Sequence, residues 1–131
     1  MRVVFDTNIF VSALALPGSV AERALFRVIE GRDHLIVSKA LIHELLGVLA
    51  KKFSHDQEEL ARVAVFLADI AELVDPDRRI NTLPDDADNR ILEAAVTGRA
   101  EVIVTGDQAM LRLGRFEGIQ MLSLHAYLRS S

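Results

Sequence analysis

Two aspartates in this 131-residue sequence directly follow strand-like apolar runs, at positions that suit ligand binding. Asp6 comes after the run VVF at 3–5, and Asp107 closes the segment VIVTG at 102–106. Ligands of open α/β sheets bind outside the carboxyl ends of the strands, so both aspartates would project from one edge of a sheet. If the two strands are neighbours, their carboxylates approach each other.

Two further acids fall on helices that are expected to begin at the same edge. Glu44 lies in the second turn of a helix capped by Ser38, at the border of its apolar face, which lets the side chain face the sheet edge. Asp88 lies in the first turn of a helix opened by Asp85 or Asp86, where free N–H groups favour a carboxylate. The sequence thus predicts four acids around one cleft.

Each of these acids also has an ordinary explanation when it is taken alone. Asp6 could simply cap the helix after the first strand, and Asp107 could be a turn residue. Asp88 could stabilise the helix dipole, and Glu44 could be a solvated helix acid. Only the combination of all four is specific.

Four carboxylates in one cleft require cations or bound protons. Two carboxylates about 4 Å apart repel by about 4 kcal/mol at an effective dielectric constant of about 20. The sequence contains no cysteine, so any metal must be held by oxygen or imidazole, and oxygen ligands suit Mg²⁺ or Mn²⁺. No pair of the four histidines has metal-ligand spacing on one face, and we expect none of them to bind metal: His34, His43, His55 and His125.

The elements that must position these acids alternate between strands and helices. Buried strands are predicted at 3–5, 35–37, 102–104 and 119–122. Helices are predicted from Ser19 to Gly31 with Glu22 completing a capping box, after Ser38, after a capping box of Ser54 and Gln57, and from Asp85 or Asp86 to Gly98. The segment 73–83 is either a short strand or a loop. This order predicts an α/β fold, a three-layer sandwich with a mainly parallel central sheet flanked by helices.

Length and composition predict one domain spanning residues 1–131. Half of the residues are apolar and 26% are charged, which is typical of a globular chain. The net charge of −4 argues against a protein that coats nucleic acid, although twelve arginines remain available for phosphate contacts. No basic-then-apolar leader and no apolar stretch near 18 residues is visible, which predicts a cytosolic location.

The motifs VVFDTNIFVSAL, SKALIHELLGVLAKKF, LPDDADNRILEAA and VIVTGDQAML resemble those of PIN-domain proteins over nearly the whole chain. The resemblance is to compact prokaryotic members that act as ribonuclease toxins of toxin–antitoxin pairs. It implies Mg²⁺- or Mn²⁺-dependent endoribonuclease activity, with catalytic and metal-binding roles for Asp6, Glu44, Asp88 and Asp107. It also implies that Thr7, Asn8 and Thr105 orient the acids, and Asp85 is an auxiliary candidate.

In such a site, metal-bound hydroxide would attack phosphorus while a second ion steadies the leaving oxygen. Whether Glu44 or Asp88 also accepts a proton from the water stays open. Three nearby arginines are candidates for RNA phosphate contacts, or else solvated surface residues: Arg90, Arg112 and Arg115.

The resemblance further implies RNA as substrate, a cognate antitoxin protein as partner and a homodimer. Four apolar residues outside the main helical stripes could form a dimer face or belong to the core: Phe10, Leu14, Leu16 and Phe26.

Two other classes of function fit parts of the pattern. A receiver-type phosphotransfer domain would need a late lysine, but all three lysines occur at or before residue 52, and Asn8 stands where an aspartyl phosphatase would have its second acid. The stronger alternative is a non-catalytic PIN-like module, in which the acids form a structural site and the protein binds RNA or a partner.

Overall fold

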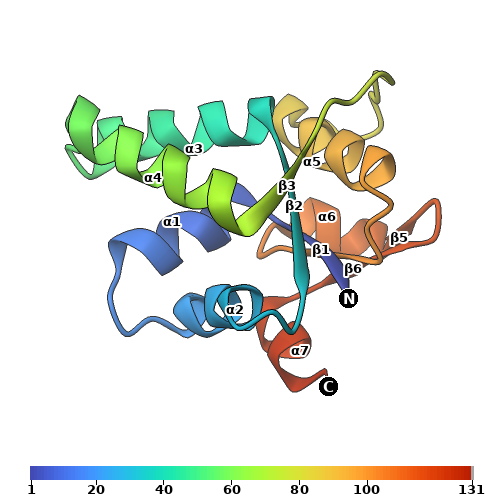
Figure 1. Cartoon of the computed structure of the whole chain (residues 1–131). Coiled ribbons are helices and arrows are strands. Elements are labelled where there is room, and N and C mark those ends of the chain that lie inside the picture. The colour runs from blue at the N-terminus through green and yellow to red at the C-terminus, as the bar shows by residue number, and fades with distance from the viewer. Residues whose placement is uncertain (131) are drawn as a thin grey trace.

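The computed structural model describes residues 1–130, which form six strands and seven helices (Figure 1). The strands are β1 (Arg2–Phe5), β2 (His34–Ser38), β3 (Ala71–Val74), β4 (Val102–Val104), β5 (Arg115–Phe116) and β6 (Ile119–Leu122). The helices are α1 (Thr7–Ala15), α2 (Val20–Ile29), α3 (Lys39–Lys52), α4 (Gln57–Ile70), α5 (Asp86–Thr97), α6 (Gln108–Leu113) and α7 (Leu124–Arg129).

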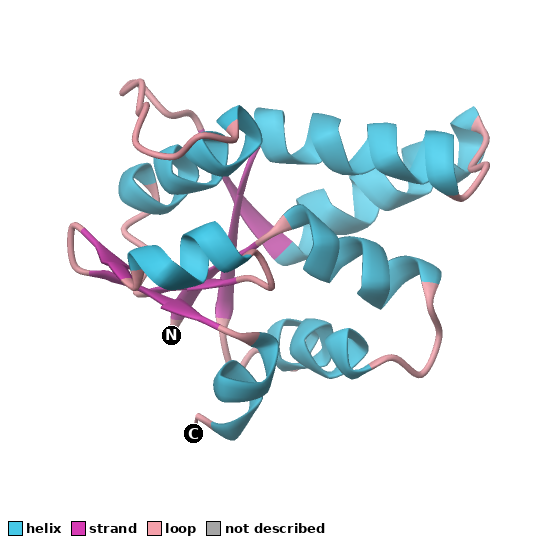
Figure 2. Ribbon diagram, turned by 180° about the vertical axis from the view of Figure 1, so that it is seen from behind, coloured by secondary structure: helices cyan, strands magenta, loops and turns pink. Residues whose placement is uncertain are grey.

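The strands form one sheet in the order β3-β2-β1-β4-β6-β5, parallel except for the short antiparallel pair β5 and β6. Helices pack on both faces of this sheet, as the view from behind also shows (Figure 2). The predicted three-layer α/β class is therefore confirmed. Of the six strands, the four predicted from apolar runs are all present, and β3 resolves the uncertain segment 73–83 into a strand followed by a loop.

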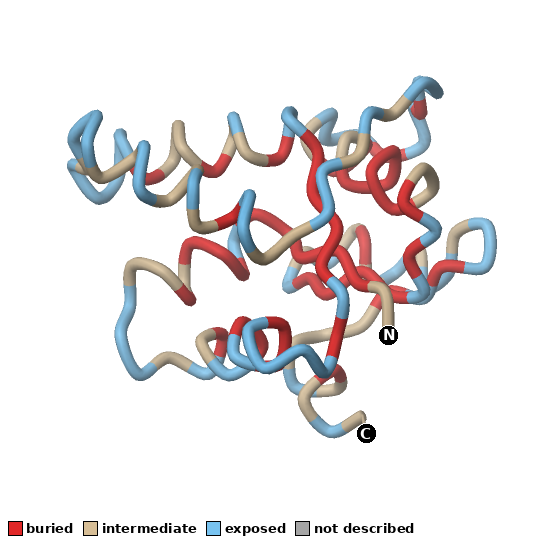
Figure 3. The backbone as a smooth tube through the Cα atoms, in the orientation of Figure 1, coloured by how far each residue is buried: buried red, intermediate tan, exposed pale blue. Residues whose placement is uncertain are grey.

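Alternation along the central strands divides the core into two parts. Val3 and Phe5 of β1 face the layer that contains α1, α2, α4 and α7, whereas Val4 faces the layer of α5 and α6. Helix α3 contributes Leu45 to the first part and Leu41 to the second, so it lies across the sheet edge. The buried residues concentrate on the central strands and the helix faces that pack on them (Figure 3).

Helix capping follows the sequence in some places and departs from it in others. Ser38 caps α3 as predicted, because its hydroxyl accepts from the Leu41 N–H at 3.3 Å. The prediction that Ser19 forms a capping box is wrong, since its hydroxyl instead donates to the Ser12 carbonyl oxygen at 2.9 Å. The box predicted at Ser54 is also wrong, because Asp56 forms the box two residues later.

Helix α5 ends at Gly98 as predicted, and close packing explains why a glycine stands there. Gly98 has helical φ, and a Cβ atom there would lie 2.5 Å from Cγ2 of Ile36. The left-handed residue is Arg99, with φ of 55°. Close packing of α5 on β2 therefore requires the glycine, and the chain reverses one residue later.

The C-terminal helix α7 is attached to the sheet by a buried polar cluster that the sequence did not reveal. Nε of Arg27 lies 3.1 Å from Oδ2 of Asp33, and the Tyr127 hydroxyl donates to the same carboxylate. The Arg27 guanidinium also lies 4.5 Å from the centre of the Tyr127 ring and donates to the Tyr127 carbonyl oxygen at 2.9 Å. The cluster joins three segments at the amino end of β2.

The four apolar residues considered for a dimer face separate into core and surface. Phe10 is only 2% exposed and packs against Phe5, so it belongs to the core, and Leu14 is partly buried against the same core. Leu16 and Phe26 are 49% and 47% exposed.

Within residues 1–130, no single helix is long and apolar enough to cross a membrane. Helices α1 and α2 together reach that length and hydropathy, but the pair is bent by 98°.

Candidate active site

The predicted convergence of Asp6 and Asp107 depends on β1 and β4 being neighbours, and they are. Phe5 pairs with Val104 in parallel register, so both aspartates emerge at the carboxyl edge of the sheet. Thr105 links them: its hydroxyl donates to Oδ2 of Asp6 at 2.7 Å and accepts from the Asp107 N–H at 3.0 Å. This fully buried threonine fixes the rotamer of Asp6 and the backbone of Asp107 together.

Each of the two aspartates also caps a helix. Asp6 caps α1 through the Asn8 N–H at 3.3 Å, and Asp107 caps α6 through the Ala109 N–H at 2.9 Å. Burial raises the pKa of Asp6, the negative charge of Asp107 raises it further, and the bonds from Thr105 and the backbone only partly offset this. The capping explanation therefore holds for both aspartates, and it leaves a ligand role for the same carboxylates open.

Asp88 carries the strongest electrostatic strain of the edge. It is 6% exposed, and its Oδ2 atom is buried without any hydrogen-bond partner. Burial is the largest cause of a rise in the pKa of Asp88 to about 7, to which the charges of Asp107, Asp85 and Asp6 and a proton shared with Asp107 also contribute. A buried carboxylate oxygen without a donor is costly unless a cation or proton joins it.

Glu44 faces the same group of acids from α3. Burial raises the pKa of Glu44, the Thr7 hydroxyl lowers it, and the charges of Asp6 and Asp85 raise it. Thr7 thus lies where it was expected, as a buried polar contact to one of the acids. The negative charge of Asp85, the auxiliary candidate, raises the pKa of both Glu44 and Asp88.

Asn8 occupies the site differently from the prediction. Its side chain is exposed, and the contact with Asp6 comes from its backbone N–H. Any residue other than proline could supply that donor. Asn8 is therefore an orienting residue through its backbone alone in this structure.

The three arginines considered for RNA contacts lie in three different environments. Arg90 donates to Asp86 and to the Ile80 carbonyl oxygen and pairs with Glu93 at 2.8 Å. Its guanidinium is therefore engaged in contacts within the fold. Arg112 is exposed in the last turn of α6. Arg115 pairs with Gln120, which faces the first residue of β4, so it lies at the amino edge, away from the acids.

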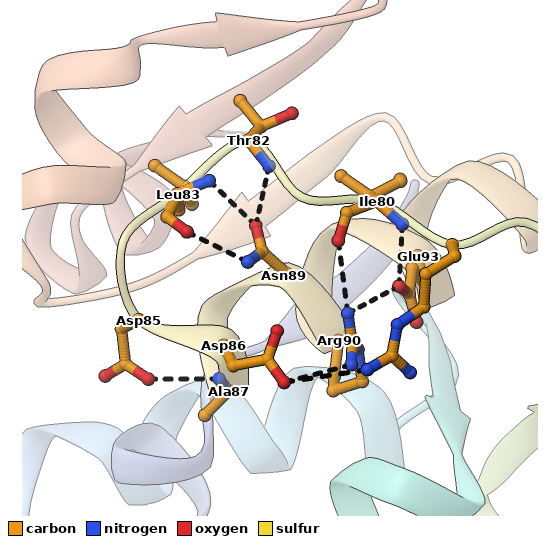
Figure 4. A network of polar contacts seen from close by, with 10 residues as sticks. Ile80, Thr82, Leu83, Asp85, Asp86, Ala87, Asn89, Arg90 and Glu93 are labelled. Atoms are coloured by element: carbon orange, nitrogen blue, oxygen red, sulfur yellow. Dashed lines mark hydrogen bonds and ion pairs between the residues drawn. The ribbon is translucent and has the colours of Figure 1, made fainter.

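Hydrogen bonds that attach the loop before α5 to this helix were not predicted from the sequence (Figure 4). Asn89 is 1% exposed, and its side chain accepts from the Leu83 N–H at 2.8 Å and donates to the Leu83 carbonyl oxygen at 2.9 Å. Oε2 of Glu93 accepts from the Ile80 N–H at 2.8 Å. These bonds fasten the loop before Asp85 to the helix that carries Asp88. Polar residues on the inner face of α5 were the available signal.

The donor set fits a hard divalent cation. Every acid at the edge offers carboxylate oxygen, and the orphaned Asp88 oxygen is a buried acceptor that a cation would satisfy. Within the described residues no three such side chains already surround one point at ligand distance. The residues that would hold the ion are Asp6, Glu44, Asp88 and Asp107.

The fold and this edge define a class of protein: a three-layer α/β domain with four acids at the carboxyl ends of its parallel strands. The family model described as PIN domain matches residues 2–109, which contain all four acids, and the chain belongs to the PIN domain family.

One relative in sequence and three in structure accompany this match. The uncharacterized protein MJ1680 of Methanocaldococcus jannaschii is 24% identical over 117 residues, which cover 86% of this chain and 75% of the relative. VapBC-1 from nontypeable Haemophilus influenzae is 19% identical with a TM-score of 0.65, covering 95% of this chain and 99% of the other.

VapBC2 from Rickettsia felis, solved bound to a DNA fragment from its promoter, is 15% identical with a TM-score of 0.64 and covers 94% and 98% of the two chains. FitAcB from Neisseria gonorrhoeae is 14% identical with a TM-score of 0.58, covering 94% of this chain and 98% of the other. At these identities the solved structures establish a shared fold.

Proposed function

We propose that this protein is an Mg²⁺- or Mn²⁺-dependent endoribonuclease that hydrolyses RNA phosphodiester bonds, and that it is the toxin of a toxin–antitoxin pair. The observation that supports this most strongly is the buried Asp88 oxygen without a partner, next to the charges of Asp6 and Asp107. Such an arrangement is stable only with a cation or a proton. Membership of the PIN domain family agrees with nuclease chemistry.

In this proposal the acids serve first as ligands. Asp6, Glu44, Asp88 and Asp107 would hold the ion, which when bound supplies a more acidic water and charge compensation at the phosphate. Thr105 holds Asp6 in place through its hydrogen bond, and the Thr7 hydroxyl favours the charged form of Glu44. Glu44 and Asp88 are the two candidates to accept the proton of the attacking water, because burial raises the pKa of both carboxyl groups.

The test is cleavage of single-stranded RNA with Mn²⁺ or Mg²⁺ and with EDTA, by wild type, Asp6→Asn and Asp107→Asn. We expect cleavage only with metal, and a loss of at least about 100-fold in both variants, because each removes one ligand charge. Asp56→Asn is the matched control, since Asp56 caps α4 away from the site and asparagine keeps a cap.

Two outcomes would contradict the proposal. Retained cleavage in both Asp6→Asn and Asp107→Asn would exclude the acidic edge as the active site. RNA binding by a wild type that never cleaves RNA with either metal would instead identify a non-catalytic PIN-like binding module.

The proposed biological setting is cytoplasmic, with an antitoxin that covers the acidic cleft and a homodimer of this chain. The support is the fold shared with VapBC and FitAcB structures and the toxin-type motifs of the sequence. Leu16 and Phe26 are the exposed apolar residues best placed among those considered for a dimer face. Co-purification with the product of a neighbouring gene and sedimentation analysis would test both.

A further inference from the structure

Helix α3 has a net positive charge, whereas the protein as a whole is acidic. All three lysines of the chain lie in α3, with Glu44 as its only acid, although the net charge of the protein is −4. In residues 1–130 the ion pairs are made by arginines, His34 and the amino terminus, and none involves a lysine. The lysine charges are therefore available to a ligand.

A groove of about 280 Å³ runs along α3 from the candidate active site, with a lining of His43, Glu44, Gly47, Val48, Lys51 and Lys52. On a helix, seven residues turn through almost two full turns, so Lys51 lies within about 20° of Glu44 and about 10 Å further along. Lys39 is about 140° away from Glu44 around the same helix. The groove thus joins a site acid to two free lysines.

Gly47 forms part of this groove and has no evident role within the monomer. A glycine inside a helix costs roughly 0.5–1 kcal/mol relative to alanine. A Cβ atom at Gly47 would meet nothing within 4 Å, so neither close packing nor a positive φ requires the glycine. Its absent side chain leaves the middle of the groove open between Glu44 and Lys51.

We propose that this α3 groove (His43, Gly47, Lys51 and Lys52) binds the phosphate backbone of the substrate strand next to the scissile bond. The inference rests on the proposed ribonuclease function and specifies how its substrate lies. Lysines supply point charges for phosphates, and the groove begins at a site acid. With two unpaired lysines and a single acid in its lining, the groove has a net positive charge, which suits an anionic strand.

Binding of a fluorescein-labelled single-stranded RNA tests this, with Mg²⁺ present and every variant in the Asp107→Asn background to prevent cleavage. We expect Lys51→Gln/Lys52→Gln to weaken binding about 10-fold at 0.1 M salt and to lower the slope of log Kd against log salt by about 1.4, or about 0.7 per lost contact. Lys39→Gln is the matched control, with a change below about 2-fold, because it lies outside the groove.

Gly47→Glu separates binding from folding. Glutamate is a better helix former than glycine and has room here, so the melting temperature should stay the same or rise while RNA affinity falls at least about 10-fold. A variant that merely unfolded would lose both.

The result that overturns the proposal is equal weakening by Lys39→Gln and by the double variant, or no weakening by either. Lysine-dependent binding of a poly-glutamate peptide without RNA binding would assign the groove to an acidic protein segment and also overturn it. Wild-type cleavage with unaffected lysine variants rejects the groove alone, whereas groove-dependent binding without wild-type cleavage rejects only the ribonuclease function.

Discussion

Buried aspartates lie at both edges of the sheet, Asp33 at the amino edge and Asp6 and Asp88 at the carboxyl edge. Their surroundings shift the pKa in opposite directions at the two edges. At the amino end of β2, Asp33 is held by Tyr127, the amino terminus of Met1 and Arg27; burial alone would raise its pKa, but these partners outweigh burial and lower it. At the carboxyl edge, burial and neighbouring acids raise the pKa values of Asp6 and Asp88. The charge of Asp33 is paired and stabilises the fold, whereas neither Asp6 nor Asp88 takes part in an ion pair within residues 1–130.

The largest effect is expected when the paired charge of Asp33 is removed. Asp33→Asn should lower the free energy of unfolding by about 3–5 kcal/mol, because the buried Arg27 guanidinium loses its counter-charge. Urea unfolding monitored by circular dichroism measures this. The double variant Arg27→Met/Asp33→Asn should recover part of the loss, and a cost below about 1 kcal/mol for the single variant would contradict the comparison.

An intermediate effect on the melting temperature is expected when a carboxylate is removed from the acids at the carboxyl edge. In EDTA, Asp107→Asn should melt at the same or a higher temperature than wild type, because it removes repulsion and asparagine can still cap α6. At 100 times its Kd, Mn²⁺ should stabilise wild type by about 2.7 kcal/mol and the variant far less. If the variant melts lower and metal affects neither protein, Asp107 is an ordinary cap.

The smallest expected effect is the pH dependence of folding stability, which should differ between Asp88 and Asp33. The folded pKa of Asp88 is raised from 3.8 to about 7, so the folded state holds more protons than the unfolded state between these values. The full shift would correspond to about 3–4 kcal/mol over this range. Solvent screening reduces it, so stability without metal should fall by about 1–2 kcal/mol as the pH rises from about 4 to 7.

Asp88→Asn should remove that loss of stability, which thermal melts in EDTA across this pH range would reveal. Asp33 has the opposite sign, because its lowered pKa gives stability that is lost only as the pH falls below about 4. A wild type whose stability is flat from pH 4 to 7 would contradict the strained state of Asp88.

How far the sequence carried these conclusions differs between the two edges. Asp6 and Asp107 follow apolar runs directly, so the class of sheet was enough to bring them together. Arg27, Asp33 and Tyr127 have no such rule, because a hydrogen bond between residues 94 apart depends on where α7 returns to the sheet. Local patterns locate a strand end, but they do not locate a tertiary contact.

Errors in helix capping have a similar physical origin. The segment SHDQEE contains two overlapping capping boxes, Ser54 with Gln57 and Asp56 with Glu59, and the turn between α3 and α4 selects the second. Short elements were missed because two to six residues carry too little periodicity: α6, β5 and α7. In each case the deciding energy comes from packing against distant parts of the chain.

The loop fastened by Asn89 and Glu93 has a consequence for how the protein opens. Its amides at Ile80, Thr82 and Leu83 are held by side chains of α5, not by backbone ladders. The loop and α5 therefore form one cooperative unit that unfolds together, in which separate fraying of the loop is suppressed. We therefore expect any motion that admits a ligand to the acids to occur in other segments, and this loop to keep its shape.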